Sequence, residues 1–155
     1  LSMEFLAELH PRIVHFPVAL FILYFFLEAS GVLLKKNYLS KSAYIILIAG
    51  IVTAVIAVLT GNQAHEAAKI LYKEKINLLD GMIEQHEQNA TITLWYFFAV
   101  LVLRTYLILK KKFENKWKYI FIPLGLAGCY LIYITGIHGG QLVFKYGIGT
   151  KLFGK

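Results

Sequence analysis

Five histidines are the residues of this sequence best suited to bind a metal ion or a haem: His10, His15, His65, His86 and His138. Neutral imidazole ligates haem iron, copper and zinc, and imidazoles on facing helices can hold a haem iron from both sides. Four of the five lie within a turn or two of the end of a long apolar segment. A helical bundle would bring such side chains to one level, so the positions indicate a ligand site at one end of a bundle.

His86 and His138 are the strongest candidates for ligands. His86 continues an apolar stripe at helical spacing, where an unpaired imidazole would be costly. The stripe also contains Leu79, Ile83, Ala90 and Thr93.

The remaining histidines have competing interpretations. His15 stands beside Pro17, which lacks an N–H, so ligation and the capping of a freed backbone carbonyl are equally good explanations. His10 precedes Pro11 in a segment expected to be extended, which favours a surface position or a supporting role beside the ligands. His65 is expected to be a solvated residue at a helix end.

A haem also needs a flat slot, which small residues and aromatic rings can provide. Glycines accompany two of the histidines: Gly61, Gly136, Gly139 and Gly140. Aromatic residues that could cover the faces of the ring are Phe16, Trp95, Tyr96 and Phe144. The plainer explanation is that these glycines end helices and these aromatics form the usual belt at the membrane interface.

Four apolar runs must position these residues. The chain is 58% hydrophobic and 16% charged, and a ~30 Å hydrocarbon core needs about 20 apolar residues per helix. The runs are Ile13–Leu34, Ser42–Thr60, Thr91–Leu109 and Tyr119–His138. We therefore expect an all-α membrane protein, with a single domain over residues 1–155 that forms an antiparallel four-helix bundle. No internal repeat is apparent.

The distribution of Lys and Arg predicts the orientation. They crowd the first and third connections, which should therefore face the cytoplasm: Lys35, Lys36, Lys41, Arg104, Lys110, Lys111, Lys112, Lys116 and Lys118. Both termini and all five histidines would then lie on the opposite, periplasmic side of a bacterial inner membrane. The net charge of +7 is explained by topology rather than by nucleic-acid binding.

The second connection, residues 61–90, should be a helical hairpin or cap. Asp80-Gly81 is its best breaker, which predicts that the third long helix begins near Met82. The glycine-rich tail after His138 is too short to cross again and should lie on the outer interface. Glu28, the one acidic residue deep in a run, is expected to reach toward Lys35 or Lys41 at the interface, with proton relay as the alternative.

Other chemistry has little support. Neither "HEAAK" nor "HEQNA" completes the His-Glu-x-x-His zinc motif. The single cysteine, Cys129, excludes covalent haem attachment through a Cys-x-x-Cys-His motif, and no phosphate loop or serine nucleophile elbow is present. A zinc or copper site built from His86, His15 and His138 remains open, as binding or transport.

Four segments resemble the bacterial membrane proteins grouped as domain of unknown function 2231: "HPRIVHFPVAL", "AGIVTAVIAVLTG", "HEQNATITLWYF" and "GGQLVFKYGIG". The resemblance covers nearly the whole chain. It implies a four-helix inner-membrane domain with a b-haem or electron-transfer role. By position the family's residues match His10, His15, His86, Gly139, Gly140, Gly147 and Gly149, and less clearly His65 and His138.

We therefore expect a membrane redox protein rather than a stand-alone enzyme. It would bind non-covalent haem b and pass electrons between the quinone pool and a periplasmic redox protein. His86 would be one axial ligand, with His15 or His138 opposite, His10 in support, and Gly139 and Gly140 close to the ring. The alternative is a cofactor-free subunit that docks or assembles a larger complex.

Overall fold

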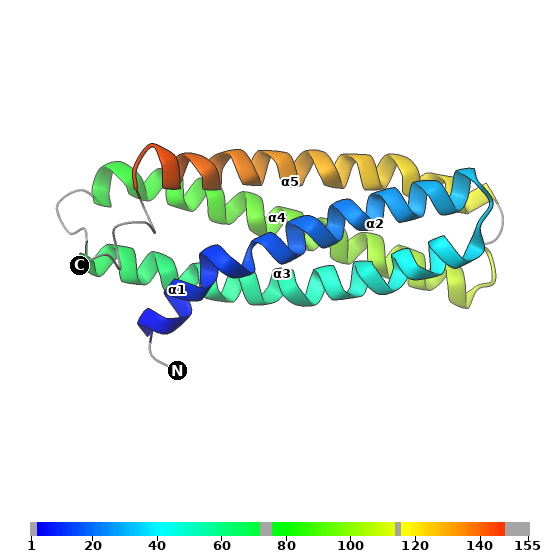
Figure 1. Ribbon diagram of the computed structural model, residues 1–155, viewed down its shortest axis with the longest axis horizontal. Helices are drawn as coiled ribbons and strands as arrows, with labels where there is room; N and C mark the ends of the chain where they lie inside the picture. Colours follow the sequence, from blue (N-terminus) through cyan, green and yellow to red (C-terminus); the bar gives the residue numbers. More distant parts are fainter. Residues whose placement is uncertain (1–2, 72–75, 114–115, 148–155) are drawn as a thin grey trace.

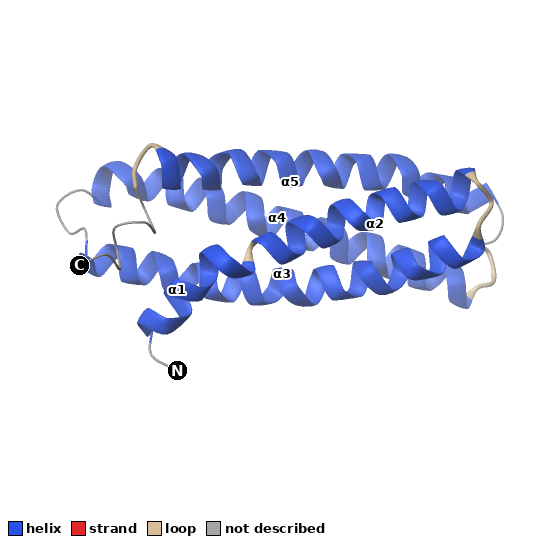
Figure 2. Ribbon diagram, viewed as in Figure 1, coloured by secondary structure: helices blue, strands red, loops and turns tan. Residues whose placement is uncertain are grey.

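The computed structural model describes residues 3–71, 76–113 and 116–147, and these residues form helices and short turns (Figures 1 and 2). The elements are α1 (Met3–Ile13), α2 (His15–Leu33), α3 (Asn37–Leu71), α4 (Ile76–Leu109), a short 3-10 helix η1 (Lys116–Ile120) and α5 (Phe121–Phe144). No strand occurs in the described part. The predicted all-α fold is confirmed.

Four helical stretches are long and apolar enough to cross a membrane, as predicted: Phe5–Leu33, Asn37–Ile70, Asp80–Leu109 and Lys116–Phe144. Helices α2 and α4 each pack against both α3 and α5. In Figure 1, α3 and α5 run along opposite edges of the bundle, and α2 lies in front of α4 between them. Each long helix therefore packs closely against at least two others and leaves its outer face exposed.

Helices extend beyond the predicted spans at the end of the bundle where α3 and α5 end and α4 begins. Asp80-Gly81 does not break α4, so the predicted start near Met82 is wrong. An isolated glycine costs a helix only about 1 kcal/mol. Packing offsets that cost, because Ile83 of α4 is buried together with Leu142 of α5. That contact also explains why α5 continues past His138 to Phe144; the tail from residue 148 lies outside the described residues.

The segment around His10 is helical, so the predicted extended conformation is wrong. Pro11 lies near the end of α1, where its ring removes only one hydrogen bond of a short helix. Pro17 lacks the N–H that would bind the carbonyl of Ile13, and the chain leaves the helix for one residue at Val14. The resulting bend between α1 and α2 (Figure 2) carries α1 across α3.

The core contains a pair of stacked rings and a buried ion pair. Phe21 of α2 and Phe97 of α4 stack with centroids 3.8 Å apart and planes 3° apart. Further along the same helices, Arg104 binds Glu28 with 2.5 Å between Nη1 and Oε2, and both side chains are fully buried. The hydroxyl of Ser40 donates a hydrogen bond to the Glu28 carboxylate. The backbone carbonyl of Ser40 accepts a hydrogen bond from Nη2 of Arg104, with 2.6 Å between the nitrogen and the oxygen.

This ion pair corrects two expectations. Glu28 does not reach toward Lys35 or Lys41, and Arg104 does not act as an exposed interfacial charge. A buried carboxylate is tolerated only with a partner charge and hydrogen bonds. Arg104 of α4 supplies the charge and one hydrogen bond, and the hydroxyl of Ser40 in α3 donates further hydrogen bonding.

Candidate functional site

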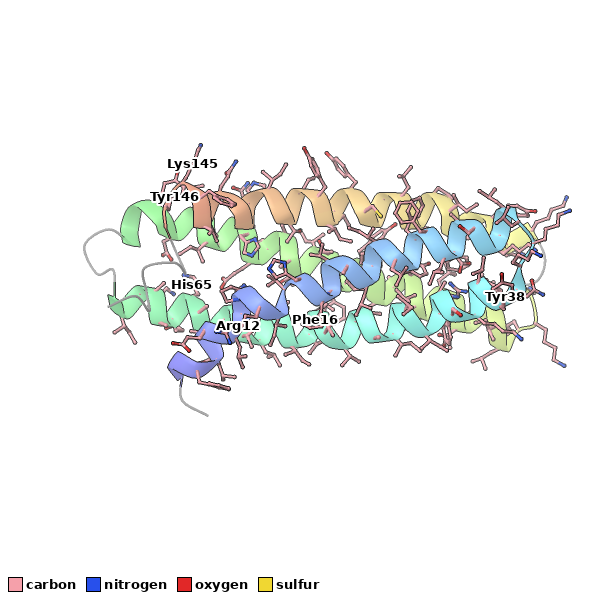
Figure 3. The ribbon with its side chains drawn as sticks, in the orientation of Figure 1. Arg12, Phe16, Tyr38, His65, Lys145 and Tyr146 are labelled. Atoms are coloured by element: carbon pink, nitrogen blue, oxygen red, sulfur yellow. The ribbon has the colours of Figure 1, made fainter. Side chains whose placement is uncertain are left out.

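Four of the histidines gather at the end of the bundle where α3 and α5 end and α4 begins (Figure 1). We call this part, which contains His10, His65, His86 and His138, the histidine end. Figure 3 labels His65 there and Tyr38 at the opposite end. The opposite end carries Lys35, Lys36, Lys41, Lys110, Lys111, Lys112, Lys116 and Lys118 and is called the lysine end.

His86 lies half-buried on α4 and turns its ring toward α5. Its Nδ1 is 3.2 Å from the carbonyl oxygen of Thr135. Gly139, one turn further along α5, provides the space for the ring, since a Cβ at that position would lie 2.9 Å from Cε1 of His86. The apolar stripe predicted to face inward does so, because Ile83 and Thr93 of the same helix are buried.

His10 has the same arrangement between α1 and α3. Its Nδ1 lies 3.0 Å from the carbonyl oxygen of Ala57 and 3.3 Å from the hydroxyl of Thr60. Gly61 provides the space, and a Cβ there would lie 3.0 Å from Cε1 of His10. His10 is therefore held inside the bundle rather than on its surface.

These contacts determine which nitrogen of each ring is free. A carbonyl oxygen only accepts hydrogen bonds, so Nδ1 carries the proton in both His10 and His86, and the neutral ring keeps its lone pair on Nε2. No hydrogen-bond partner of either Nε2 occurs among the described residues. Histidines that ligate metals are held in this way, with the other ring nitrogen bonded to a carbonyl. The two rings are close enough to interact electrostatically.

His138 and His15 are placed differently. Nδ1 of His138 lies 2.9 Å from the carbonyl oxygen of Ile134 in its own helix, with the Asn89 amide 3.2 Å away. His138 is close enough to His86 for the two rings to interact electrostatically. His15 is the first residue of α2 and is exposed.

His65 connects α3 to α4 through two carboxylates. Its Nε2 is 2.8 Å from Asp80 and its Nδ1 is 3.1 Å from Glu87. Its side chain is only 12% exposed, so the expectation of a solvated histidine is wrong. Both ring nitrogens thus contact carboxylate oxygens of α4, and the two contacts hold the extended ends of α3 and α4 together.

Only some of the residues predicted to form the slot lie beside a histidine. Gly139 lies against the imidazole of His86, whereas nothing lies within 4 Å of a Cβ placed at Gly140. Phe16, Trp95 and Phe144 are exposed on the outside of the bundle, where aromatic residues suit a membrane interface. Tyr96 donates its hydroxyl to the carbonyl of Leu124.

The donor set fits a haem better than a bare metal ion. In the described part of the chain, no group of three or more His, Cys, Asp or Glu side chains could hold a metal ion. Zinc sites generally take three or four protein ligands. A haem iron already has four nitrogens from its porphyrin and needs only one or two imidazoles from the protein.

Sequence reasoning undervalued His10, although a signal for its position exists. Gly61 follows Gly50 at the same spacing as Gly139 follows Gly128. The glycine beside His10 therefore has a counterpart beside His86.

Comparison with known proteins agrees with the fold. No curated protein and no solved structure matches the chain. The sequence profile of one family matches residues 7–152, which is nearly the whole chain. The matched segment includes the four long helices and all four histidines of the histidine end. The chain therefore belongs to the family described as predicted membrane protein, domain of unknown function 2231.

Proposed function

We propose that this protein is a membrane redox protein that holds one non-covalent haem b at its histidine end, with His86 as an axial ligand. The observation that carries the proposal is the fixed imidazole of His86. Its Nδ1 donates to the carbonyl of Thr135, so the lone pair of Nε2 would be available to a haem iron. When bound, a haem with two imidazole ligands takes up and releases one electron without an open position for oxygen chemistry.

The protein's own residues would orient the ligand and exclude water. The carbonyl of Thr135 selects the tautomer and fixes the plane of the His86 ring, while Gly139 lets α5 approach it. Ile83, Met82 and Leu142 pack nearby and shield this end of the bundle. An imidazole held so firmly binds with little loss of side-chain freedom.

The charge distribution supports an orientation and a set of partners. The lysine end would face the cytoplasm of a bacterial inner membrane and the histidine end the periplasm. The electron partners would be the quinone pool and a periplasmic redox protein. An apolar groove of about 560 Å³ lies between α2 and α5, lined by residues such as Val18, Phe25, Cys129 and Gly136. A lipid-soluble quinone could approach from this side.

Absorption spectroscopy tests the proposal directly. The full chain, expressed with ample haem precursor and purified in detergent, should show a Soret band and sharp α and β bands after reduction with dithionite. The pyridine haemochrome assay should identify haem b at one per chain. Colourless protein would contradict the proposal, and if it co-purified with fixed partners it would favour a docking subunit.

A further inference from the structure

Helices α2 and α4 both run from the histidine end to the lysine end, and they terminate in the same way. Lys35 and Lys111 follow α2 and α4 and have φ angles of 55° and 53°. After each, the next N–H bonds back to a helix carbonyl at 2.9 Å, Lys36 to Gly31 and Lys112 to Leu107. The three residues at the end of α4, Lys111, Lys112 and Leu107, each stand 76 places after their counterparts at the end of α2, which are Lys35, Lys36 and Gly31.

The interior contacts repeat with the same spacing. Phe21 and Phe97 stack on each other, and each also lies against a glycine of the following helix, Gly50 and Gly128 respectively. Glu28 and Arg104, which form the buried ion pair, are again 76 places apart. Counterparts in α2 and α4 therefore face each other across the middle of the bundle.

The surroundings of His10 and His86 repeat most closely. The carbonyls that accept from them, Ala57 and Thr135, and the glycines beside them, Gly61 and Gly139, are 78 places apart in each case. A Cβ on either glycine would lie 3.4 Å from Nδ1 and 3.6 Å from Nε2 of its histidine. The two imidazoles thus have matching positions and tautomers.

The sequence carries a weak form of the repeat. Ala-Gly, ten residues, then Gly-x-Gln occurs at 49–63 in α3 and again at 127–141 in α5. Most of the ten residues between differ in the two segments, and four of the ten are exposed in each.

We infer that the chain is a duplicated helical hairpin, and that His10 is the second axial ligand, supplied by one half of the molecule as His86 is supplied by the other. The site would be made of two equivalent half-sites, so it suits a flat ligand with two equivalent faces, such as an iron porphyrin. This inference rests on the proposed function for the identity of that ligand.

The repeat also argues against His138 as a ligand. Its counterpart 78 places earlier is Thr60. Thr60 donates to the carbonyl of Ile56, and His138 lies against the carbonyl of Ile134, again a pair 78 places apart. His138 and Thr60 therefore occupy the same supporting position beside His86 and His10.

Matched substitutions test the inference in the full-length protein. His10→Ala and His86→Ala should each convert the low-spin haem spectrum to high-spin, and added imidazole should restore the low-spin bands in both. His15→Ala, His65→Ala and His138→Ala should keep the low-spin spectrum. If haem is bound but His10→Ala leaves it low-spin, or His138→Ala changes it as His86→Ala does, the equivalence is wrong.

Glycine substitutions provide a second, independent readout. Gly61→Ala and Gly139→Ala should lower haem occupancy to a similar extent, because each added methyl group would press on an imidazole. Gly136→Ala and Gly140→Ala are controls on α5, since their methyl groups would meet nothing within 4 Å. A loss confined to Gly139→Ala would contradict the inference.

Nitrogen-15 NMR of the haem-free, unsubstituted protein needs no variant and no ligand. The imidazoles of His10 and His86 should both show the Nδ1-protonated tautomer. If no haem binds, the proposed function fails, yet this measurement still decides whether the two half-sites are equivalent. Different tautomers for the two rings would overturn the inference whatever the haem content.

Discussion

Arg104 is a cation inside a bundle whose outer surface is apolar, and it stays there because each of its charged contacts is made within the protein. Its guanidinium bonds to Glu28 and Ser40 and lies 4.7 Å from the centroid of the Phe113 ring. Desolvating two opposite charges is tolerable only while both are present. Glu28 and Arg104 therefore depend on each other, because either charge left alone in this core would be strongly unfavourable.

Removing one partner should be strongly destabilising. Arg104→Gln or Glu28→Gln should lower the free energy of unfolding by about 3–5 kcal/mol, since each leaves a buried charge or its hydrogen-bond partners uncompensated. Thermal unfolding in detergent, followed by circular dichroism, measures the effect. The exposed pair Glu66–Lys69 is the control, and Glu66→Gln should cost less than about 1 kcal/mol. Equal effects at the two sites would contradict this account.

Sequence reasoning reached some residues and not others for a physical reason. The stripe containing Ile83, His86 and Thr93 repeats at helical spacing, so its inward face could be predicted locally. The ion pair could not, because its partners are 76 residues apart and each, taken alone, resembles an interfacial charge. His10 was likewise judged from Pro11 beside it, whereas its position depends on Ala57 and Gly61 of a different helix.

Helix ends show the same division between local and tertiary information. Hydropathy located four spans because each needs a long apolar run, but it marks where lipid contact stops rather than where the helix stops. Helices α3, α4 and α5 therefore continue beyond the predicted spans. The duplicated hairpin is hard to see in the sequence, because the matching residues are few and lie 76 or 78 places apart among many that differ.

The two lysines with positive φ are a further feature of helix ends. Glycine is the usual residue at this position of a helix C-terminus, and a side chain there costs roughly 1 kcal/mol. Lysine supplies instead a cation where the chain leaves the membrane. Its presence at both Lys35 and Lys111 indicates that charge placement outweighs local strain here.

Glycine at these positions should stabilise the protein. Lys35→Gly and Lys111→Gly should each raise the free energy of unfolding by up to about 1 kcal/mol, because glycine adopts positive φ without strain. Lys36→Gly and Lys112→Gly are matched controls that remove the same charge without relieving a positive φ, and they should not stabilise. Chemical denaturation in detergent micelles compares the four variants; stabilisation by the controls would show that charge, not φ, is responsible.

For the molecule as a whole, the placement of lysines predicts a sidedness that can be measured. In a Cys129→Ala background, single cysteines at Lys36 and Lys112 should resist a membrane-impermeant thiol reagent added to intact spheroplasts. Cysteines at Glu66 and Gln88 should react. Detergent lysis should make all four reactive. The reverse pattern would place the histidine end in the cytoplasm and remove the periplasmic partner from the proposal.

The separation between the histidine end and the buried ion pair has a consequence for energy conversion. His86 and Arg104 lie on one helix, and 18 residues at 1.5 Å each separate them by roughly 27 Å. A haem bound as proposed would lie at the histidine end, near one face of the membrane. An electron held there would enter and leave on the same face of the membrane. A charge that crossed the bilayer would exchange about 2.3 kcal/mol per 100 mV with the membrane potential. An electron that stays near one face would exchange very little energy with that potential. Its transfer would therefore be electroneutral and would proceed at the same rate in energised and de-energised cells.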